Sequence, residues 1–208
     1  MKNRPEGLRT WIEIDKKAIK HNYNIFRGLI SPKTKLMAVV KSNAYGHGLM
    51  DFSSEISRLG ADWLGVDSIV EALALRKEGI KIPILVLGST LPEMAKLAIS
   101  NDISLAVSTL EFLKEVNIGA GETLKIHVKA DSGMHRHGFL EKDLEVVIEL
   151  LKKMRGKVEV EGLFTHFASA KNPTLLGSTK AQLAEFNKWV SRFKENGFSP
   201  IVHASATG

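Results

Sequence analysis

The sequence contains no cysteine and no long hydrophobic run. Without cysteine the chain cannot form disulfides, use a thiol nucleophile or bind zinc or iron–sulfur clusters through thiolates, and a reducing compartment is favoured. Its longest apolar runs, such as 36–40 and 84–87, have the length of strands, far below the roughly 20 residues of a membrane-spanning helix. No apolar stretch behind the charged N-terminus could serve as the core of a secretion signal. We therefore expect a cytoplasmic protein without a membrane partner.

The sequence also lacks a block of charge of one sign. It has 29 basic and 23 acidic side chains, a formal charge of +6, and the two signs alternate along helical stretches. This pattern is typical of a solvated surface and argues against nucleic acid as a partner. The length of 208 residues suits one domain.

Short apolar runs alternate with segments in which apolar residues recur every three or four positions. The runs predict strands over 35–41, 63–67, 84–88, 104–108, 124–130, 158–166 and 201–205. A helix is expected after Asp15, and Gly79 and Gly197 are expected to follow helix ends. Ser or Thr followed three positions later by Glu or Gln predicts further helix starts at Ser68, Thr90, Ser108 and Thr179.

This alternation predicts an α/β fold with a parallel sheet. Two architectures fit: an open doubly wound sheet and a (β/α)₈ TIM-type barrel of eight strands and about 250 residues. Because the chain stops directly after a seventh strand, we expect a truncated barrel, and a complete seven-stranded open sheet stays the alternative.

Polar side chains follow several predicted strands. Lys41 ends the first strand within the stretch AVVKSNAYGHG (38–48), where a partly desolvated amine can attack a carbonyl. A lysine on a surface turn explains the same spacing. Arg136 lies between two glycines after the fifth strand and can present its guanidinium to a carboxylate or an aromatic oxygen. A metal site formed by Asp131, His135 and His137 is a weaker reading, because ligands two positions apart on such a loop carry little specificity.

The sixth and seventh strands end in further polar groups. His166 ends the sixth strand, although a single strand-end histidine is more often structural than catalytic. Ser205, Thr207 and Gly208 supply hydroxyls and backbone amides where barrels often bind phosphate. An amine, an arginine, a histidine and an anion cradle at one rim together suggest a phosphorylated cofactor that bears an aldehyde.

The stretch 38–48 resembles the pyridoxal-phosphate attachment signature of bacterial alanine racemases. Residues 11–15 resemble the opening of that family, and 85–88, 129–139 and 162–168 resemble its later strands, in order. The resemblance covers the whole chain and corresponds to roughly the first half of the family's protein. It implies that residues 1–208 form an incomplete TIM-type barrel domain, with the family's C-terminal β domain missing. It also implies pyridoxal 5'-phosphate as cofactor, alanine as substrate, D-alanine for peptidoglycan as product, and a homodimer in the full-length protein.

The resemblance also implies roles for single residues. Lys41 would bind the cofactor covalently and act as one of two bases at the substrate Cα. Tyr45 would donate a hydrogen bond to the cofactor phosphate, which Thr207 and the backbone at Gly208 would also bind.

The remaining implied roles concern the later strands. Arg136 would contact the phenolic oxygen of the cofactor, and Lys129, as a carbamate in some members, would hold Arg136. His166 would support an arginine that faces the pyridine nitrogen. That arginine and the second base, a tyrosine of the partner subunit, would lie beyond residue 208, so we expect the fragment alone to be inactive.

Two departures from the family pattern leave the substrate open. Ala206 and Thr207 stand where the family usually has Asn and Ser, and His135 and His137 stand where glycine and an apolar residue are commoner. The alternatives are a racemase for serine, lysine or a broad set of amino acids, and a non-catalytic pyridoxal-phosphate carrier with the same barrel. A metal-dependent barrel hydrolase would need ligand pairs on the first strand, and the sequence has none there.

Overall fold

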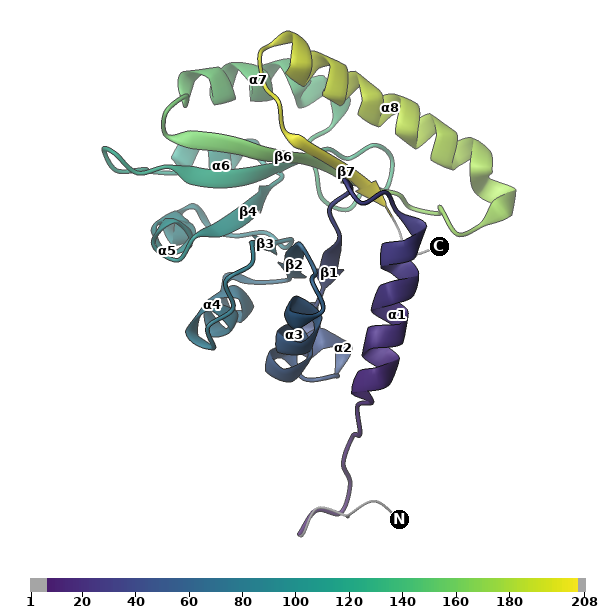
Figure 1. The fold of residues 1–208 in the computed structure, drawn as a ribbon. Coiled ribbons are helices and arrows are strands. Elements are labelled where there is room, and N and C mark those ends of the chain that lie inside the picture. The colour runs from purple at the N-terminus through teal and green to yellow at the C-terminus, as the bar shows by residue number, and fades with distance from the viewer. Residues whose placement is uncertain (1–6, 206–208) are drawn as a thin grey trace. The chain divides into compact units, whose positions relative to one another are not determined.

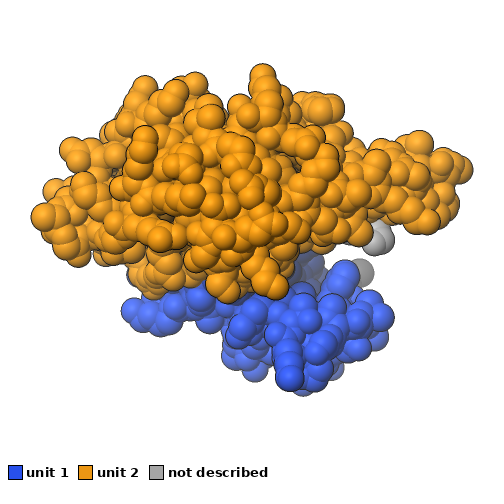
Figure 2. Space-filling model, turned by 90° about the horizontal axis from the view of Figure 1, so that it is seen from above, with its two compact units in different colours: residues 1–83 blue, residues 84–208 orange. Residues whose placement is uncertain are grey.

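The computed structural model describes residues 7–205 (Figure 1). Backbone contacts divide the chain into two compact units, residues 1–83 and 84–208, which Figure 2 shows in different colours. Thr207 and Gly208, two of the predicted phosphate-binding residues, lie outside the described residues.

The described residues of the first unit, 7–83, form two parallel strands and four helical segments. Its elements are α1 (Lys16–Leu29), β1 (Met37–Val39), α2 (Lys41–Tyr45), α3 (Leu49–Arg58), β2 (Trp63–Val66) and α4 (Ile69–Lys77). Asp15 caps α1 as expected, because its carboxylate accepts the Lys17 N–H at 2.7 Å. β1 pairs with β2 in parallel, and Ala38 lies opposite Leu64. Val40, which directly follows β1, and Val66, the last residue of β2, are both fully buried, and they bring the two following loops to the same edge.

Residues 84–205 of the second unit form five parallel strands that are neighbours in chain order. Its elements are β3 (Ile84–Val86), η1 (Pro92–Met94), α5 (Ala95–Ser100), β4 (Ile103–Val107), α6 (Leu110–Glu115), β5 (Leu124–Lys129), η2 (Glu141–Asp143), α7 (Leu144–Lys153), β6 (Val158–His166), η3 (Pro173–Leu175), α8 (Leu176–Glu195) and β7 (Ile201–Ser205). Pairing runs from β3 to β4, β5, β6 and β7. The parallel order places the carboxyl ends of β5, β6 and β7 at one edge, as the predicted site requires.

Side chains from α8 fill much of the core of this unit. Trp189, Phe186 and Phe193 are fully buried, and Trp189 stacks on Phe139 with ring centroids 6.3 Å apart. Burial of such aromatic faces is the largest stabilising contribution available to a sheet covered by helices. Of the helices in the described part of the chain, none combines the length and apolarity that crossing a bilayer requires.

The predicted strands are confirmed to within two residues at each end, but three of the five predicted helix starts are wrong. Ser68 caps α4 as expected. Ser108 is replaced as cap by its neighbour Thr109, whose hydroxyl accepts the Phe112 N–H. The segment after Thr90 begins as a 3₁₀ turn at Pro92, and Thr179 lies inside α8, which starts at Leu176.

Candidate functional site

Lys41 lies at the carboxyl end of β1, but it is not part of the strand as predicted. β1 ends at Val39, Val40 is fully buried, and Lys41 begins the turn α2. The Lys41 side chain is 35% exposed, and its Nζ donates to Oδ1 of Asp67 at 3.3 Å. Asp67 directly follows β2, so the amine is held beside the neighbouring strand end with access to solvent.

The turn after Lys41 has an unusual backbone. Ser42, Asn43, Ala44 and Tyr45 all have φ between 52° and 56°, the left-handed region. Non-glycine residues pay about 1–2 kcal/mol each in this conformation, so the turn must be held by other contacts.

Asn43 supplies many of these contacts. Its backbone oxygen accepts from the N–H of Gly46 and Gly48 at 3.0 and 3.1 Å, and its side-chain Oδ1 accepts from the Leu49 N–H at 2.8 Å. The result is a fixed loop on which the Tyr45 side chain is 62% exposed, with its hydroxyl available to a ligand.

The loop after β5 carries Arg136 and is closed by Asp131. One carboxylate oxygen of Asp131 accepts from the backbone N–H of Gly133 and His135, at 3.0 and 2.9 Å. Burial raises the pKa of Asp131, but these N–H donors outweigh it and leave that pKa below its usual value. At Gly138, φ is +140° and an added Cβ would lie 2.5 Å from the Asp131 nitrogen, so only glycine fits this close approach. Arg136 is exposed on this loop and forms no ion pair with a described residue of its unit.

Lys129 is buried at the end of β5. The side chain is 7% exposed, and its Nζ lies 5.6 Å from the ring centroid of Phe164 on β6. The Phe164 ring also stacks on His203 of β7, with ring planes 3° apart and centroids 4.7 Å apart, and His127 contacts it edge-on at 6.5 Å. His166, the last residue of β6, is half-buried and pairs in register with Ser205. Lys129 and His166 thus lie at the ends of adjacent strands, as predicted.

A buried polar network that the sequence analysis missed lies on β4, β5, β6 and β7. His127 is 1% exposed, its Nδ1 lies 2.9 Å from Nε2 of His203, and its Nε2 lies 3.4 Å from a carboxylate oxygen of Glu161. Ser104 donates its hydroxyl to the same carboxylate oxygen at 2.5 Å. Burial, and then the neighbouring His127, lower the pKa of His203 to about 3. Burial raises the pKa of Glu161, but the nearby His127 imidazole and the hydrogen bond from Ser104 bring it below its usual value.

The sequence does carry a signal for this network. Polar residues 125, 127 and 129 alternate with apolar residues 124, 126 and 128 on β5. Since alternate residues of a strand point to opposite faces, the polar set had to share one face of the sheet.

The structure does not support the metal site considered for Asp131, His135 and His137. Nδ1 of His135 lies 3.9 Å from Oδ2 of Asp131. Among residues 7–205, no group of three or more His, Cys, Asp and Glu side chains is arranged to hold a metal ion.

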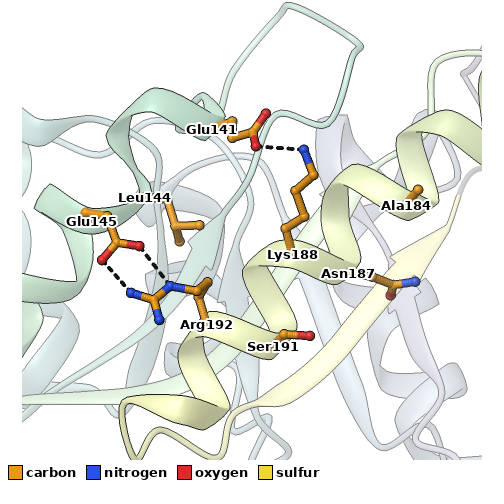
Figure 3. A pocket seen from close by; sticks show the side chains of 8 residues that line it. All are labelled: Glu141, Leu144, Glu145, Ala184, Asn187, Lys188, Ser191 and Arg192. Carbon is orange, nitrogen blue, oxygen red and sulfur yellow. Dashed lines mark hydrogen bonds and ion pairs between the residues drawn. The ribbon is translucent and has the colours of Figure 1, made fainter.

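A groove between α7 and α8 lies on the outer, helical surface of the second unit (Figure 3). Ion pairs cross it from Lys188 to Glu141 at 2.7 Å and from Arg192 to Glu145 at 2.7 Å. These side chains are largely exposed, so water screens the pairs and they add little to stability. None of the predicted site residues lines this groove, and its charged groups neutralise one another, which leaves it without a recognisable chemistry.

Known proteins are similar to this chain over nearly its full length. Residues 14–208 match the family model described as alanine racemase, N-terminal domain. Alanine racemase 2 of Oceanobacillus iheyensis is 42% identical over 204 residues, which are 95% of this chain and 51% of that protein. The crystal structure of alanine racemase from Bacillus anthracis with bound L-Ala-P is 36% identical, with a TM-score of 0.89 over 97% of this chain and 53% of that chain. A histidine racemase from Leuconostoc mesenteroides is 30% identical, with a TM-score of 0.78 over 91% of this chain and 50% of that chain.

These matches decide between the two architectures that the strand pattern left open. The fold is that of the alanine racemase N-terminal TIM-type barrel, because solved alanine racemases align with it over almost its full length. The chain spans about half the length of the curated relatives that it matches. It belongs to the alanine racemase family, in which it corresponds to the N-terminal domain.

Proposed function

We propose that this chain is the pyridoxal-phosphate-binding part of a racemase that interconverts L-alanine and D-alanine, and that Lys41 carries the cofactor. The observation that carries the proposal is the primary amine at the end of β1, held by Asp67 on a fixed turn, in a chain whose family is the alanine racemases. The L-Ala-P bound by the Bacillus anthracis relative favours alanine as the substrate. Supply of D-alanine for peptidoglycan in the cytoplasm is the role that we infer for this activity.

The residues present fit this cofactor. The Lys41 amine is partly exposed and can condense with an aldehyde, and the exposed Tyr45 hydroxyl can donate to a phosphate. Arg136 has a guanidinium without an ion pair in its unit, which suits a phenolic oxygen. Thr207 and Gly208 are proposed to complete the phosphate site. The donor set is thus cationic and hydroxylic, as an anionic phosphate ester requires.

When bound, pyridoxal phosphate would spread the negative charge that develops at the substrate Cα, which no side chain can do. Once the amino group of the substrate has replaced it on the cofactor aldehyde, Lys41 would again be a free amine and would take or return the Cα proton at its Nζ on one face of the substrate. Asp67 positions that nitrogen by accepting its hydrogen bond. Arg136 would orient the ring through its oxygen, with Lys129 supporting Arg136 and His166 supporting the arginine at the pyridine nitrogen.

Racemisation requires a second base on the opposite face. We propose that a tyrosine of the partner subunit in a homodimer supplies it, from a segment beyond residue 208. The 208-residue chain alone is therefore expected to bind the cofactor and to racemise alanine slowly or not at all.

An absorbance titration with pyridoxal phosphate tests the proposal. The chain should develop a protein-dependent change in the cofactor spectrum that Lys41→Ala abolishes, whereas Lys35→Ala, an exposed lysine before β1, should leave it intact. A spectrum identical in the chain and in Lys41→Ala would contradict the cofactor assignment.

The choice of amino acid has a second candidate. The similarity to a histidine racemase indicates that this fold serves more than one side chain, and a racemase for serine, lysine or a broad set of amino acids stays in competition. An assay of the chain joined to the rest of its racemase, against L-alanine, L-serine and L-lysine, separates these. If the protein binds the cofactor but turns over none of the three amino acids, the result would instead support a non-catalytic pyridoxal-phosphate carrier.

A further inference from the structure

We propose that Glu71 is a positioning residue for Lys41. A single carboxylate holds together the left-handed turn that begins at Lys41 and the loop that carries Asp67, the hydrogen-bond partner of Lys41. The inference deepens the proposed function, since its consequence is the placement of the reactive amine.

Both oxygens of Glu71 accept backbone hydrogen bonds. Oε1 accepts from the N–H of Asn43 at 3.2 Å, and Oε2 accepts from the N–H of Asp67 at 2.9 Å. Asn43 follows β1 and Asp67 follows β2, so one side chain ties the loops of two neighbouring strands to each other. A carboxylate accepting from two N–H groups forms stronger bonds than neutral acceptors do.

The turn needs such a contact. Its four consecutive left-handed residues are strained, and Asn43, their hub, already uses its backbone and side-chain oxygens within the loop. The Asn43 N–H is the remaining polar group of this residue's backbone, and Glu71 is its partner. Without this bond the turn would keep its internal contacts but lose the link between its backbone at Asn43 and the β2 loop, which would leave the partly exposed Lys41–Asp67 side-chain contact to hold the two loops together.

The position of Glu71 follows from the start of α4. Ser68 caps this helix by accepting the Glu71 N–H at 3.3 Å, which fixes the first turn of α4. In a capping box the Glu side chain would return to the backbone N–H of Ser68. Here it reaches one residue further back, to Asp67, and across to Asn43. The capping signal in the sequence therefore serves a second purpose.

The ion pair of Lys41 depends on the same geometry. Lys41 Nζ lies 3.3 Å from Asp67 Oδ1. Glu71 accepts from the backbone N–H of Asp67 itself and from that of Asn43, two residues after Lys41. If the two loops separate, Asp67 no longer holds the amine and its direction varies. We expect this to slow the reaction of Lys41 with an aldehyde.

Glu71→Gln tests the inference, because the amide has nearly the same shape but offers one acceptor oxygen and turns an NH₂ donor toward one of the two N–H groups. Loss of a hydrogen bond to a charged acceptor corresponds to about a tenfold change in an equilibrium constant. We expect pyridoxal phosphate to bind Glu71→Gln about tenfold more weakly than the unaltered chain, by absorbance titration. Amide hydrogen exchange at Asn43 should be faster by a similar factor.

Ser68→Ala is the matched control. It weakens the same helix start by about 1 kcal/mol but leaves both oxygens of Glu71 in place. It should lower the melting temperature without weakening cofactor binding. Equal weakening in Ser68→Ala and Glu71→Gln would overturn the inference, since it would reduce Glu71 to a helix-stabilising residue. Should Glu71→Gln fail to fold, Glu71→Asp, which keeps the charge but is too short to reach both loops, must show the same loss.

Failure of the proposed function gives a different result. If the unaltered chain shows no Lys41-dependent binding, the cofactor assignment fails, and hydrogen exchange alone decides the positioning role. Faster exchange at Asn43 and Asp67 in Glu71→Gln, but not in Ser68→Ala, then supports the inference. Unchanged exchange, or unchanged binding in a chain that does take the cofactor, overturns it.

Discussion

Gly162 on β6 is the position where the structure makes its most severe steric demand. A Cβ added there would lie 2.1 Å from Nδ1 of His127, more than an ångström inside ordinary van der Waals contact at 3.4 Å. The imidazole cannot move aside, because it is 1% exposed and its two nitrogens lie within reach of His203 and Glu161. β6 is paired on both sides, with β5 and β7, so its backbone cannot shift either.

Gly162→Ala should therefore cost about 3 kcal/mol, at the upper end of overpacking in a close-packed core. For a chain of this size that corresponds to a fall of about 6–12 °C in melting temperature, measured by circular dichroism. Gly177→Ala, in the first turn of α8 with open space around its Cβ, is the control and should be neutral or slightly stabilising.

A second substitution identifies the cause of the loss. Truncation of the clashing ring in Gly162→Ala/His127→Ala should make the double variant less destabilised than the sum of the single variants, by at least about 1 kcal/mol. A melting temperature of Gly162→Ala within about 2 °C of the unaltered chain would refute the packing described here. Strict additivity in the double variant would assign the loss to another cause.

Two further predictions concern stability. Thr109→Ala should lower the free energy of unfolding by about 1 kcal/mol, because the Thr109 hydroxyl caps α6. Ser108→Ala should cost less than half of that in the same urea titration. A larger loss in Ser108→Ala than in Thr109→Ala would contradict the assignment of Thr109 as the cap. The pKa of His203 is lowered to about 3 in the folded chain. Between about pH 6.5 and pH 3, His203 is therefore protonated in the unfolded chain but stays neutral in the folded chain. The contribution of the neutral His203 to the free energy of unfolding is fully present above about pH 6.5 and is lost as the pH drops toward 3. The loss is about 2 kcal/mol between pH 7 and pH 5. His203→Gln should lose this part of the pH dependence, and an identical pH dependence in both chains would contradict a buried neutral imidazole.

The architecture could be predicted from the sequence because it depends on the alternation of apolar runs and helical periods, which burial enforces at every strand. Residues 158–166 and 201–205 were predicted with their exact bounds. Helix starts were less predictable. Ser108 and Thr109 are adjacent hydroxyls that can both cap a helix, and Ser is on average the better cap. Thr109 caps α6 because of where β4 leaves the sheet, which the local sequence does not specify.

The candidate site was predictable in its residue types but not in its backbone. Four consecutive left-handed residues after Lys41 are too rare for composition to indicate, and none of the four is glycine. The contacts of Glu71 with two loops likewise depend on the pairing of β1 with β2. The roles of Thr207 and Gly208 stay predictions, since both lie outside the described residues.

The most direct test of the account is the chemical identity of the group that holds the cofactor. The chain is incubated with pyridoxal phosphate, reduced with borohydride and digested, and its peptides are mapped by mass spectrometry. The account predicts one dominant adduct, a reduced pyridoxyl phosphate on Lys41, and its absence from Lys41→Ala. Adducts spread over exposed lysines, at the same level with and without Lys41, would contradict it.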